Sequence, residues 1–235
     1  MSVSLNSDEL GRITRTPRLQ LVFDRSVYYS PDMLNEQDTR QRIITSARDL
    51  IHSRSYASVG VAEICDHAAV KKGSFYHFFP SKQALSLAVI ESLRIELEDR
   101  VLIPAFARDL PPLQRLGRFI TALDAFQRSA ATTTGRLLGC PFGNLALELA
   151  TSDEVIRHKL ESVFAVIQAR FEQVLGDARD RGDIDPEAVD IAATAQAMLA
   201  YIEGVLILAK TANDPELITR LGSAFAFIRI HRLSD

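Results

Sequence analysis

Apolar residues recur at helical spacing along most of the chain. Ile43, Ile44, Ala47, Leu50 and Ile51 fall at i, i+3, i+4 and i+7, which predicts a helix that begins at Glu36 and ends near residues 52–55. Similar patterns predict further helices at about 61–68, 71–79, 82–107, 113–131, 143–150, 153–176, 188–210 and 216–232. No segment shows the alternation of a half-buried strand. The fold class predicted is therefore all-α.

Proline and capping residues divide these helices. Pro80 bars a helix from continuing through it, and Ser81 is a suitable N-cap for the helix that follows. Pro104 is expected to bend or end that helix. Ser152 or Asp153 is expected to cap the helix that starts near residue 153, and the sequence Asn-Asp-Pro at 213–215 separates the last two helices.

Residues 56–85 have the pattern of a helix-turn-helix. A short helix with Val61, Ile64 and Cys65 on its apolar face is followed by a tight turn near 68–70 and a second short, polar helix. In this motif the second helix enters the major groove of DNA. The residues expected to contact base edges or phosphates are Lys71, Lys72, Gly73, Ser74, Tyr76, His77 and Lys82. Those expected to pack in the core are Tyr56, Ile64, Phe75, Phe78 and Leu85, while Phe79 suits either core or surface and His67 the surface.

This stretch resembles the TetR family of bacterial regulators. The family pattern places an Ile-Ala-x-x-Ala-Gly-Val-Ser-x-Gly core before an aromatic-Tyr segment and a Ser-Lys pair, and residues 56–85 match most of it without a gap. Four positions depart from it. Gly60 stands where Ser or Thr usually caps a helix, Cys65 replaces Ala, Ala69 replaces the turn Gly, and Lys71 replaces Ser. A left-handed turn at Ala69 would cost about 1 kcal/mol, and both helices should be more weakly capped.

The resemblance implies an N-terminal three-helix DNA-binding domain with the helix-turn-helix, and a C-terminal helical domain for ligand binding and dimerisation. The expected division is an extension at 1–35, the DNA-binding domain at 36–85 and the ligand-binding domain at 86–235. The extension allows three interpretations: a loose terminus, a basic arm that reaches a minor groove, or residues ahead of a translation start at Met33.

Charge and composition limit the class of protein. The chain has 235 residues and a net charge of -3. Residues 36–85 hold seven basic and five acidic residues, so a slightly basic segment precedes an acidic remainder. Cys65 and Cys140 are isolated, which disfavours a zinc finger and fits a reducing cytoplasm. There is no motif for catalysis, a metal or a cofactor, no secretion signal, and no apolar run judged long enough to span a membrane, so we expect neither an enzyme nor a membrane protein.

The family resemblance also assigns roles to the C-terminal helices. Those at 153–176 and 188–210 are expected to form a homodimer interface, where Ala197, Ala200 and Gly204 would allow close approach. Two-fold symmetry would separate the DNA-reading helices by about one helical turn of DNA. A small, mostly apolar effector is expected to contact Phe106, Phe119, Leu123, Phe126, Cys140, Phe142 and Tyr201.

Residues 139–148 resemble a Gly-Cys-x-x-Gly-Asn-Leu-Ala-x-Glu element of one TetR subgroup. Asn144 is expected to cap a short helix, and Glu148 to bond backbone or an arginine. Cys140 is interpreted either as a redox or electrophile sensor or as a small buried side chain.

The resemblance implies a ligand-released repressor that binds a pseudo-palindromic operator on double-stranded DNA, and the composition favours a cytoplasmic protein. The alternatives are a repressor that senses electrophiles through Cys140 and a helical interaction protein that does not bind DNA.

Overall fold

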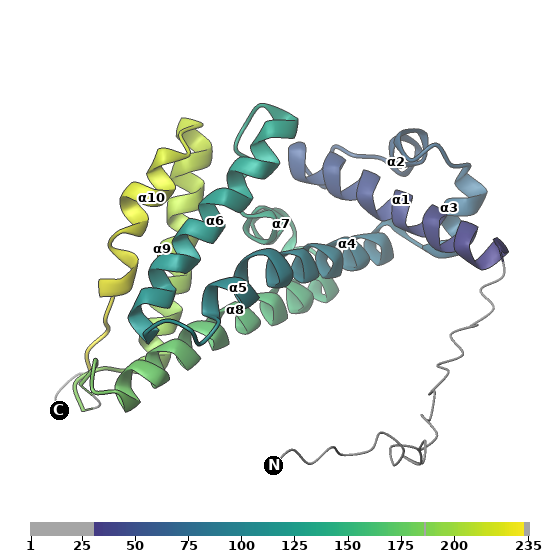
Figure 1. The fold of residues 1–235 in the computed structure, drawn as a ribbon. Coiled ribbons are helices and arrows are strands. Elements are labelled where there is room, and N and C mark those ends of the chain that lie inside the picture. Colours follow the sequence, from purple (N-terminus) through teal and green to yellow (C-terminus); the bar gives the residue numbers. More distant parts are fainter. Residues whose placement is uncertain (1–30, 186, 233–235) are drawn as a thin grey trace, which may run out of the picture.

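The computed structural model describes residues 31–185 and 187–232, and these form an all-α fold without strands (Figure 1). The interpretations of residues 1–30 lie outside the described residues. We call helices α1–α3 the head and helices α4–α10 the body. Helix α4 begins beside the head and runs into the body, so it joins the two (Figure 1).

The head consists of α1 (Pro31–Ser53), α2 (Val61–His67) and α3 (Lys72–Phe78). Ile43, Ile64 and Phe75 have no exposed surface, and Phe79 is buried with them. Tyr56 and Phe78 are half-buried and pack against this core, as the sequence predicts. One long and two short helices thus share an apolar core that fixes the orientation of α3.

Helix α1 begins five residues earlier than the predicted start at Glu36. Proline is compatible with the first turn of a helix, because that turn needs no backbone donor, and α1 begins at Pro31. Met33 therefore lies inside the helix rather than ahead of it.

Helix α4 (Lys82–Leu97) continues through a π-helical turn (Glu98–Leu102) into α5 (Ile103–Phe106). The sequence predicts one helix over this span with a bend or end at Pro104. Pro104 cannot donate a backbone hydrogen bond, and the wider π turn lies just before it. Ser81 caps α4 as predicted, since its hydroxyl accepts from the amide of Ala84 at 3.0 Å.

The rest of the body comprises α6 (Pro112–Thr134), α7 (Pro141–Leu149), α8 (Glu154–Asp180), α9 (Ile191–Ala212) and α10 (Glu216–Gly222). The long helix α8 packs against both α6 and α9, and the short α7 lies between these helices and the head (Figure 1). Asp153 caps α8 by accepting from the amide of Ile156 at 3.0 Å. Five aromatic residues meet inside the body, namely Phe106, Phe119, Phe171, Tyr201 and Phe225.

The last predicted helix, at 216–232, is too long. Helix α10 ends at Gly222, and Phe225–Phe227 form a single 3-10 turn. Gly222 lies against Ile120, where a Cβ atom would collide with that side chain. Beyond the turn the chain is extended, and His231 makes an isolated antiparallel bridge with Val189. The burial of Phe225 against Phe119 and Phe171 takes precedence over continued helix.

Helix α9 is long and apolar enough to cross a membrane by length and composition, which corrects the expectation that the chain has no such run. Only 33% of the most apolar stretch of this helix is buried inside the protein. Ile207 and Leu208 are exposed on it, and a Cβ at Gly204 would meet nothing. An uncovered apolar face of this kind is typical of a protein interface.

Candidate DNA interface and effector cavity

The turn between α2 and α3 has the geometry that the motif requires, even without its usual glycine. Ala69 has a φ of 52°, in the left-handed region. The amide of Val70 donates to the carbonyl of Cys65 at 2.9 Å, and that of Ala69 to Asp66 at 3.1 Å. These two bonds form a Schellman motif, which normally favours glycine at this position. Ala69 therefore carries the strain of a left-handed residue that has a Cβ atom.

Both helices of the motif begin without a side-chain cap. Gly60 and Lys71 occupy the N-cap positions of α2 and α3 and make no capping hydrogen bond. This agrees with the weaker caps expected from the two substitutions in the family pattern. Within the described residues, the first amides of α3 therefore receive no hydrogen bond acceptor from the N-cap side chain.

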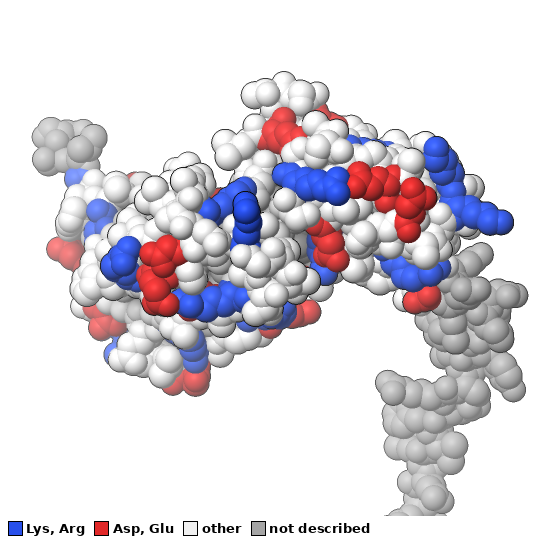
Figure 2. All heavy atoms as spheres, turned by 90° about the horizontal axis from the view of Figure 1, so that it is seen from above, with Lys and Arg blue, Asp and Glu red and all other residues white. Residues whose placement is uncertain are grey.

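Helix α3 presents a polar, exposed surface. Lys71, Lys72, Gly73, Tyr76 and His77 are all exposed, and Tyr76 keeps 56% of its surface accessible. Ser74 is half-buried. Figure 2 shows basic side chains standing out at the end of the molecule formed by the head. Among the ion pairs of the described residues none includes Lys71 or Lys72, so both ammonium groups lack an acidic side-chain partner there.

Neither the backbone conformation nor the packing at position 73 requires glycine. Its backbone is not in the left-handed region, and a Cβ atom there would meet no protein atom within 4 Å. Glycine costs about 0.5–1 kcal/mol relative to alanine inside a helix. Space kept open on an exposed helix suits close approach by another molecule.

Lys82 differs from the other predicted contacts because its ammonium points into the protein. Its Nζ donates to the carbonyl oxygen of Tyr56 and lies 3.9 Å from the centre of that ring. Burial lowers the pKa of Lys82, and Glu148 opposes this shift. Lys82 therefore holds the α1–α2 linker in place, and a contact with phosphate stays a prediction.

Glu148, near the end of α7, binds the same linker from the body. Its two carboxylate oxygens accept from the backbone amides of Tyr56 at 2.8 Å and Ala57 at 2.6 Å. This confirms the expectation that Glu148 bonds to backbone. Nearby, Gln83 donates to Asp153, the cap of α8, at 2.8 Å. The end of α7 is thus tied directly to the head.

The start of α7 lines an internal hollow of the body, which we call the inner cavity. Its volume is about 40 Å³, and α4, α6, α7, α8 and α9 contribute to its wall. Five of the seven predicted effector contacts line it: Phe119, Leu123, Phe126, Cys140 and Phe142. Gln127, Glu203 and several aliphatic side chains complete the wall.

The other two predicted contacts do not line the inner cavity. Phe106 stacks on Phe119, which lines the cavity, with ring centroids 5.6 Å apart. The hydroxyl of Tyr201 donates to the carbonyl of Leu221 at 2.8 Å and holds α10 against α9. Both side chains make packing contacts in this structure, and a contact of either with an effector stays a prediction.

Cys140 is the residue that caps α7. The sequence analysis expected Asn144 in this role, and that expectation was wrong. The Cys140 sulfur accepts from the amide of Gly143 at 3.3 Å. Asn144 instead donates to the carbonyl of Leu138 and accepts from Lys210, each at 2.9 Å. Burial, followed by the negative charge of Glu203, raises the pKa of the Cys140 thiol well above its ordinary value. The thiol is therefore protonated at neutral pH, which disfavours the reactive-thiolate interpretation.

Both glycines of the 139–148 element have a physical explanation. Gly139 has a φ of 72°, in the left-handed region that favours glycine. A Cβ at Gly143 would collide with the carboxylate of Glu203. The Gly139 carbonyl accepts from Gln127 in the body and faces His52 of the head, each at 3.3 Å. The element thus fixes the junction between head, cavity and α9.

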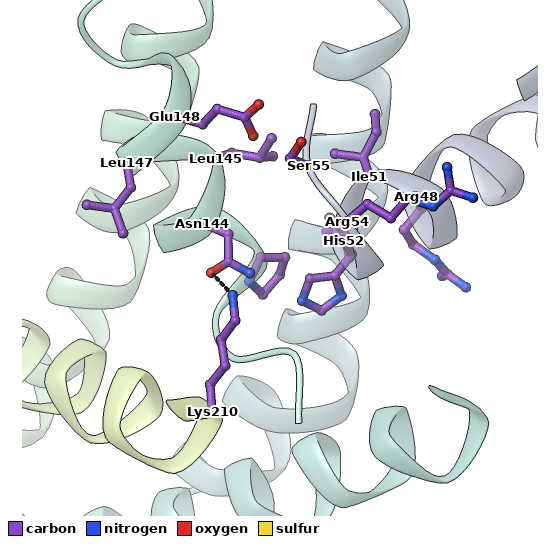
Figure 3. Close-up of a pocket in the computed structure, with 12 residues that line it drawn as sticks. Arg48, Ile51, His52, Arg54, Ser55, Asn144, Leu145, Leu147, Glu148 and Lys210 are labelled. Atoms are coloured by element: carbon purple, nitrogen blue, oxygen red, sulfur yellow. Dashed lines mark hydrogen bonds between the residues drawn. The ribbon is translucent and has the colours of Figure 1, made fainter. Parts of the chain in front are cut away.

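Two further hollows lie where head and body meet. A junction pocket of about 230 Å³ is lined by Arg48 and His52 from the head and by Asn144, Leu145 and Lys210 from the body (Figure 3). An outer groove of about 450 Å³ lies between α1 and α6. Leu93, Phe126 and Pro141 line both the outer groove and the inner cavity, so these side chains form the wall between them.

Glu203, whose carboxyl faces Cys140, was not predicted from the sequence as a site residue. A signal was present, because Glu203 is the one acidic residue in the apolar stretch of α9. Burial raises the pKa of Glu203. Across the described ranges 31–185 and 187–232, no group of His, Cys, Asp and Glu could hold a metal ion.

Comparison with known proteins agrees with this architecture. Residues 43–89 match the profile of bacterial regulatory proteins of the tetR family, and residues 112–225 match a tetracycline repressor-like C-terminal domain. An uncharacterised helix-turn-helix regulator of Lactococcus lactis is 30% identical over 185 residues, which cover 78% of this chain and 89% of that protein. The transcriptional regulator AcuR of Cereibacter sphaeroides is 32% identical over 181 residues, which cover 75% and 78%.

A solved structure has the same fold. The crystal structure of a regulatory protein TetR from Rhodobacter sphaeroides superposes with a TM-score of 0.70 at 30% identity and covers 81% of this chain and 98% of that one. The matched proteins are transcriptional regulators rather than enzymes. The head with its exposed α3, the helical body and these relatives together show that this chain is a DNA-binding transcriptional regulator of the TetR family.

Proposed function

We propose that this regulator is a homodimeric repressor that binds a pseudo-palindromic operator and is released by a small-molecule effector. The proposal rests on the position of α7 between cavity and head. The start of α7, with its cap Cys140 and with Phe142, lines the inner cavity, and Glu148 near its end binds the head. Repression relieved by a ligand is the usual behaviour of the family. A cytoplasmic location follows from binding chromosomal DNA.

The DNA-binding part of the proposal places α3 in the major groove. Lys71 and Lys72 are exposed and bind no carboxylate of the described residues, so they are available to phosphates or guanine edges. Ser74, Tyr76 and His77 lie on the same short helix. We infer that 36–85 forms the DNA-binding domain and that 86–235 forms the ligand-binding and dimerisation domain.

The dimer is proposed to form through the uncovered face of α9 together with α8. Ala200, Ile207 and Leu208 are exposed, and Gly204 is open to close approach by another helix. Ala197 is half-buried beside them. Burying such a face against a second copy removes apolar surface from water and produces the two-fold symmetry of a pseudo-palindrome.

Effector action is proposed to pass along α7. A molecule that enlarges the inner cavity displaces Cys140 or Phe142, and the nine-residue α7 moves as a rigid body. Glu148 then shifts relative to Tyr56 and Ala57, which reorients the head. The effector needs to bind the reoriented state more tightly than the DNA-binding state. The free energy by which it weakens DNA binding then equals the free energy by which DNA weakens effector binding.

The test is selection of random duplex DNA by the purified full chain, followed by a salt titration on the enriched sequence. Enrichment of a pseudo-palindrome bound by two chains, with log K falling steeply against log salt, would support the proposal. Transcription in vitro from a promoter containing that sequence should fall when the protein is added. Lack of enrichment at low salt would overturn it.

A second candidate is sensing of electrophiles by covalent attack of Cys140, favoured by the position of its sulfur at the inner cavity. The raised pKa of the thiol predicts slow alkylation at pH 7. Iodoacetamide labelling of Cys140 as a function of pH distinguishes a repressor released by a bound effector from one released by covalent modification. Rapid labelling at pH 7 that also releases operator DNA, and that is lost in Cys140→Ser, would favour the electrophile sensor.

A further inference from the structure

The wall of the inner cavity combines aromatic rings with one carboxyl group. Phe119, Phe126 and Phe142 line it, and the remaining contacts are mostly aliphatic. Glu203 and Cys140 are its ionisable side chains, and no lysine, arginine or histidine among the described residues lines it. A half-buried carboxyl is therefore present without a cationic side chain in the wall beside it.

Glu203 has a single hydrogen-bonding partner in the described structure. The Cys140 thiol donates to its carboxylate, and no ion pair of the described residues includes it. Burying a carboxylate without a counter-charge is costly, and a thiol is a weak donor that offsets little of this cost. Burial accordingly raises the pKa of Glu203.

We propose that the inner cavity recognises an organic cation, whose ammonium group is bound by the Glu203 carboxylate and by the faces of the surrounding aromatic rings. The proposal rests on the ligand-responsive function above and specifies its effector. Aromatic faces attract cations electrostatically, and the attraction is larger in a desolvated site. The apolar remainder of the wall selects a lipophilic substituent on the cation.

Access to Glu203 runs through the wall at Phe126. The inner cavity, at about 40 Å³, accommodates a few water molecules but no drug-sized compound. The outer groove, at about 450 Å³, lies on the other side of Leu93, Phe126 and Pro141. The Phe126 ring is half-buried, and the Arg100 guanidinium stacks over it at 5.0 Å. Rotation of this ring joins the two hollows and brings a lipophilic cation to the carboxylate.

The test compares three probes of similar shape by isothermal titration calorimetry on the full chain without DNA. Benzyltrimethylammonium is the cation, neopentylbenzene its uncharged isostere, and phenylacetate an anion with the same ring. We expect the cation to bind wild type at least tenfold more tightly than either other probe, which corresponds to about 1.4 kcal/mol. Equal affinity for the isostere, preference for phenylacetate, or no binding of the cation would overturn the proposal.

Two substitutions assign the preference to this carboxyl. Glu203→Gln keeps the shape of the side chain and should remove the preference for the cation. Glu161→Gln changes an exposed carboxylate of α8 and should preserve it. Retained preference in Glu203→Gln would contradict the assignment, and circular dichroism checks that this variant is folded. If it is not, the ranking of the three probes on wild type still decides.

Failure of this proposal is distinguishable from failure of the proposed function. Operator release by a neutral or anionic compound would leave the ligand-responsive repressor intact while removing the cation preference. Absence of operator binding by the protein alone would remove the repressor proposal and leave the calorimetric result standing.

Discussion

Helix α3 and the inner cavity both carry charged groups without an ionic partner, but in opposite surroundings. Lys71 and Lys72 stand in water at the start of α3, whereas Glu203 lies half-buried in an apolar wall. An unpaired charge in water costs the fold almost nothing, while an unpaired charge in an apolar interior costs several kcal/mol. Removing the lysines should therefore affect DNA binding alone, and changes around Glu203 should affect both stability and ligand binding.

The largest expected effect is the loss of DNA affinity when a lysine at the start of α3 is removed. Lys72→Ala should weaken operator binding by about 1–3 kcal/mol and should reduce the salt dependence, because one phosphate or base contact is lost per subunit. Fluorescence anisotropy on the selected duplex measures the affinity. The thermal midpoint should stay unchanged, since Lys72 forms no ion pair within the described residues.

Arg179→Ala is the matched control, because Arg179 is an exposed cation at the far end of α8. It should bind the operator like wild type. Identical operator affinity for wild type and Lys72→Ala would remove α3 as the reading helix.

The next effect concerns the link between cavity and head. Glu148→Gln should lower the free energy of unfolding by about 1–2 kcal/mol, because two backbone amides lose a charged acceptor. It should also reduce the change in operator affinity caused by an effector, since α7 then holds the head less firmly. Urea unfolding and anisotropy with and without effector measure the two quantities. A variant with full stability and full effector response would show that α7 does not couple the sites.

A smaller effect is expected at the left-handed turn of the head. Ala69→Gly should raise the free energy of unfolding by about 1 kcal/mol, because glycine adopts a φ of 52° without the strain that alanine carries. Ala68→Gly is the control: this buried neighbour has an ordinary φ of -78°, so the substitution should destabilise. Destabilisation by Ala69→Gly would mean that the turn is not strained.

The smallest change in stability is expected at Gly73. Gly73→Ala should raise the free energy of unfolding by less than about 1 kcal/mol, because a Cβ there meets no protein atom within 4 Å and alanine favours helix. Operator affinity should nevertheless fall, since the methyl group stands where DNA is proposed to approach. Thermal melting and anisotropy separate the two effects, and unchanged affinity would show that DNA does not come close at this position.

The head could be predicted from the sequence because its determinants are local. The turn at Ala69 and the helix starts at Gly60 and Lys71 depend on neighbours within a few residues, and the sequence located the turn and indicated weaker caps at both starts. The orientation of Lys82 was not foreseen, because its partners are the carbonyl and ring of Tyr56, 26 residues away.

The cavity could be predicted only in part, because its wall is assembled from five helices between Leu93 and Leu206. Apolar spacing identified Phe119, Phe126 and Phe142, but could not tell wall residues from the packed rings of Phe106 and Tyr201. The helix predicted at 216–232 failed for the same reason, since burial of Phe225 in that cluster overrides its local helical pattern.

Hydrogen exchange at single-residue resolution, with and without operator DNA, tests the coupling through α7 most directly. The account predicts that DNA binding changes the exchange of the Tyr56 and Ala57 amides, which donate to Glu148, and also that of the Phe142 and Gly143 amides at the cavity end of α7. Changes confined to the head, with α7 and the cavity wall unaffected, would contradict it.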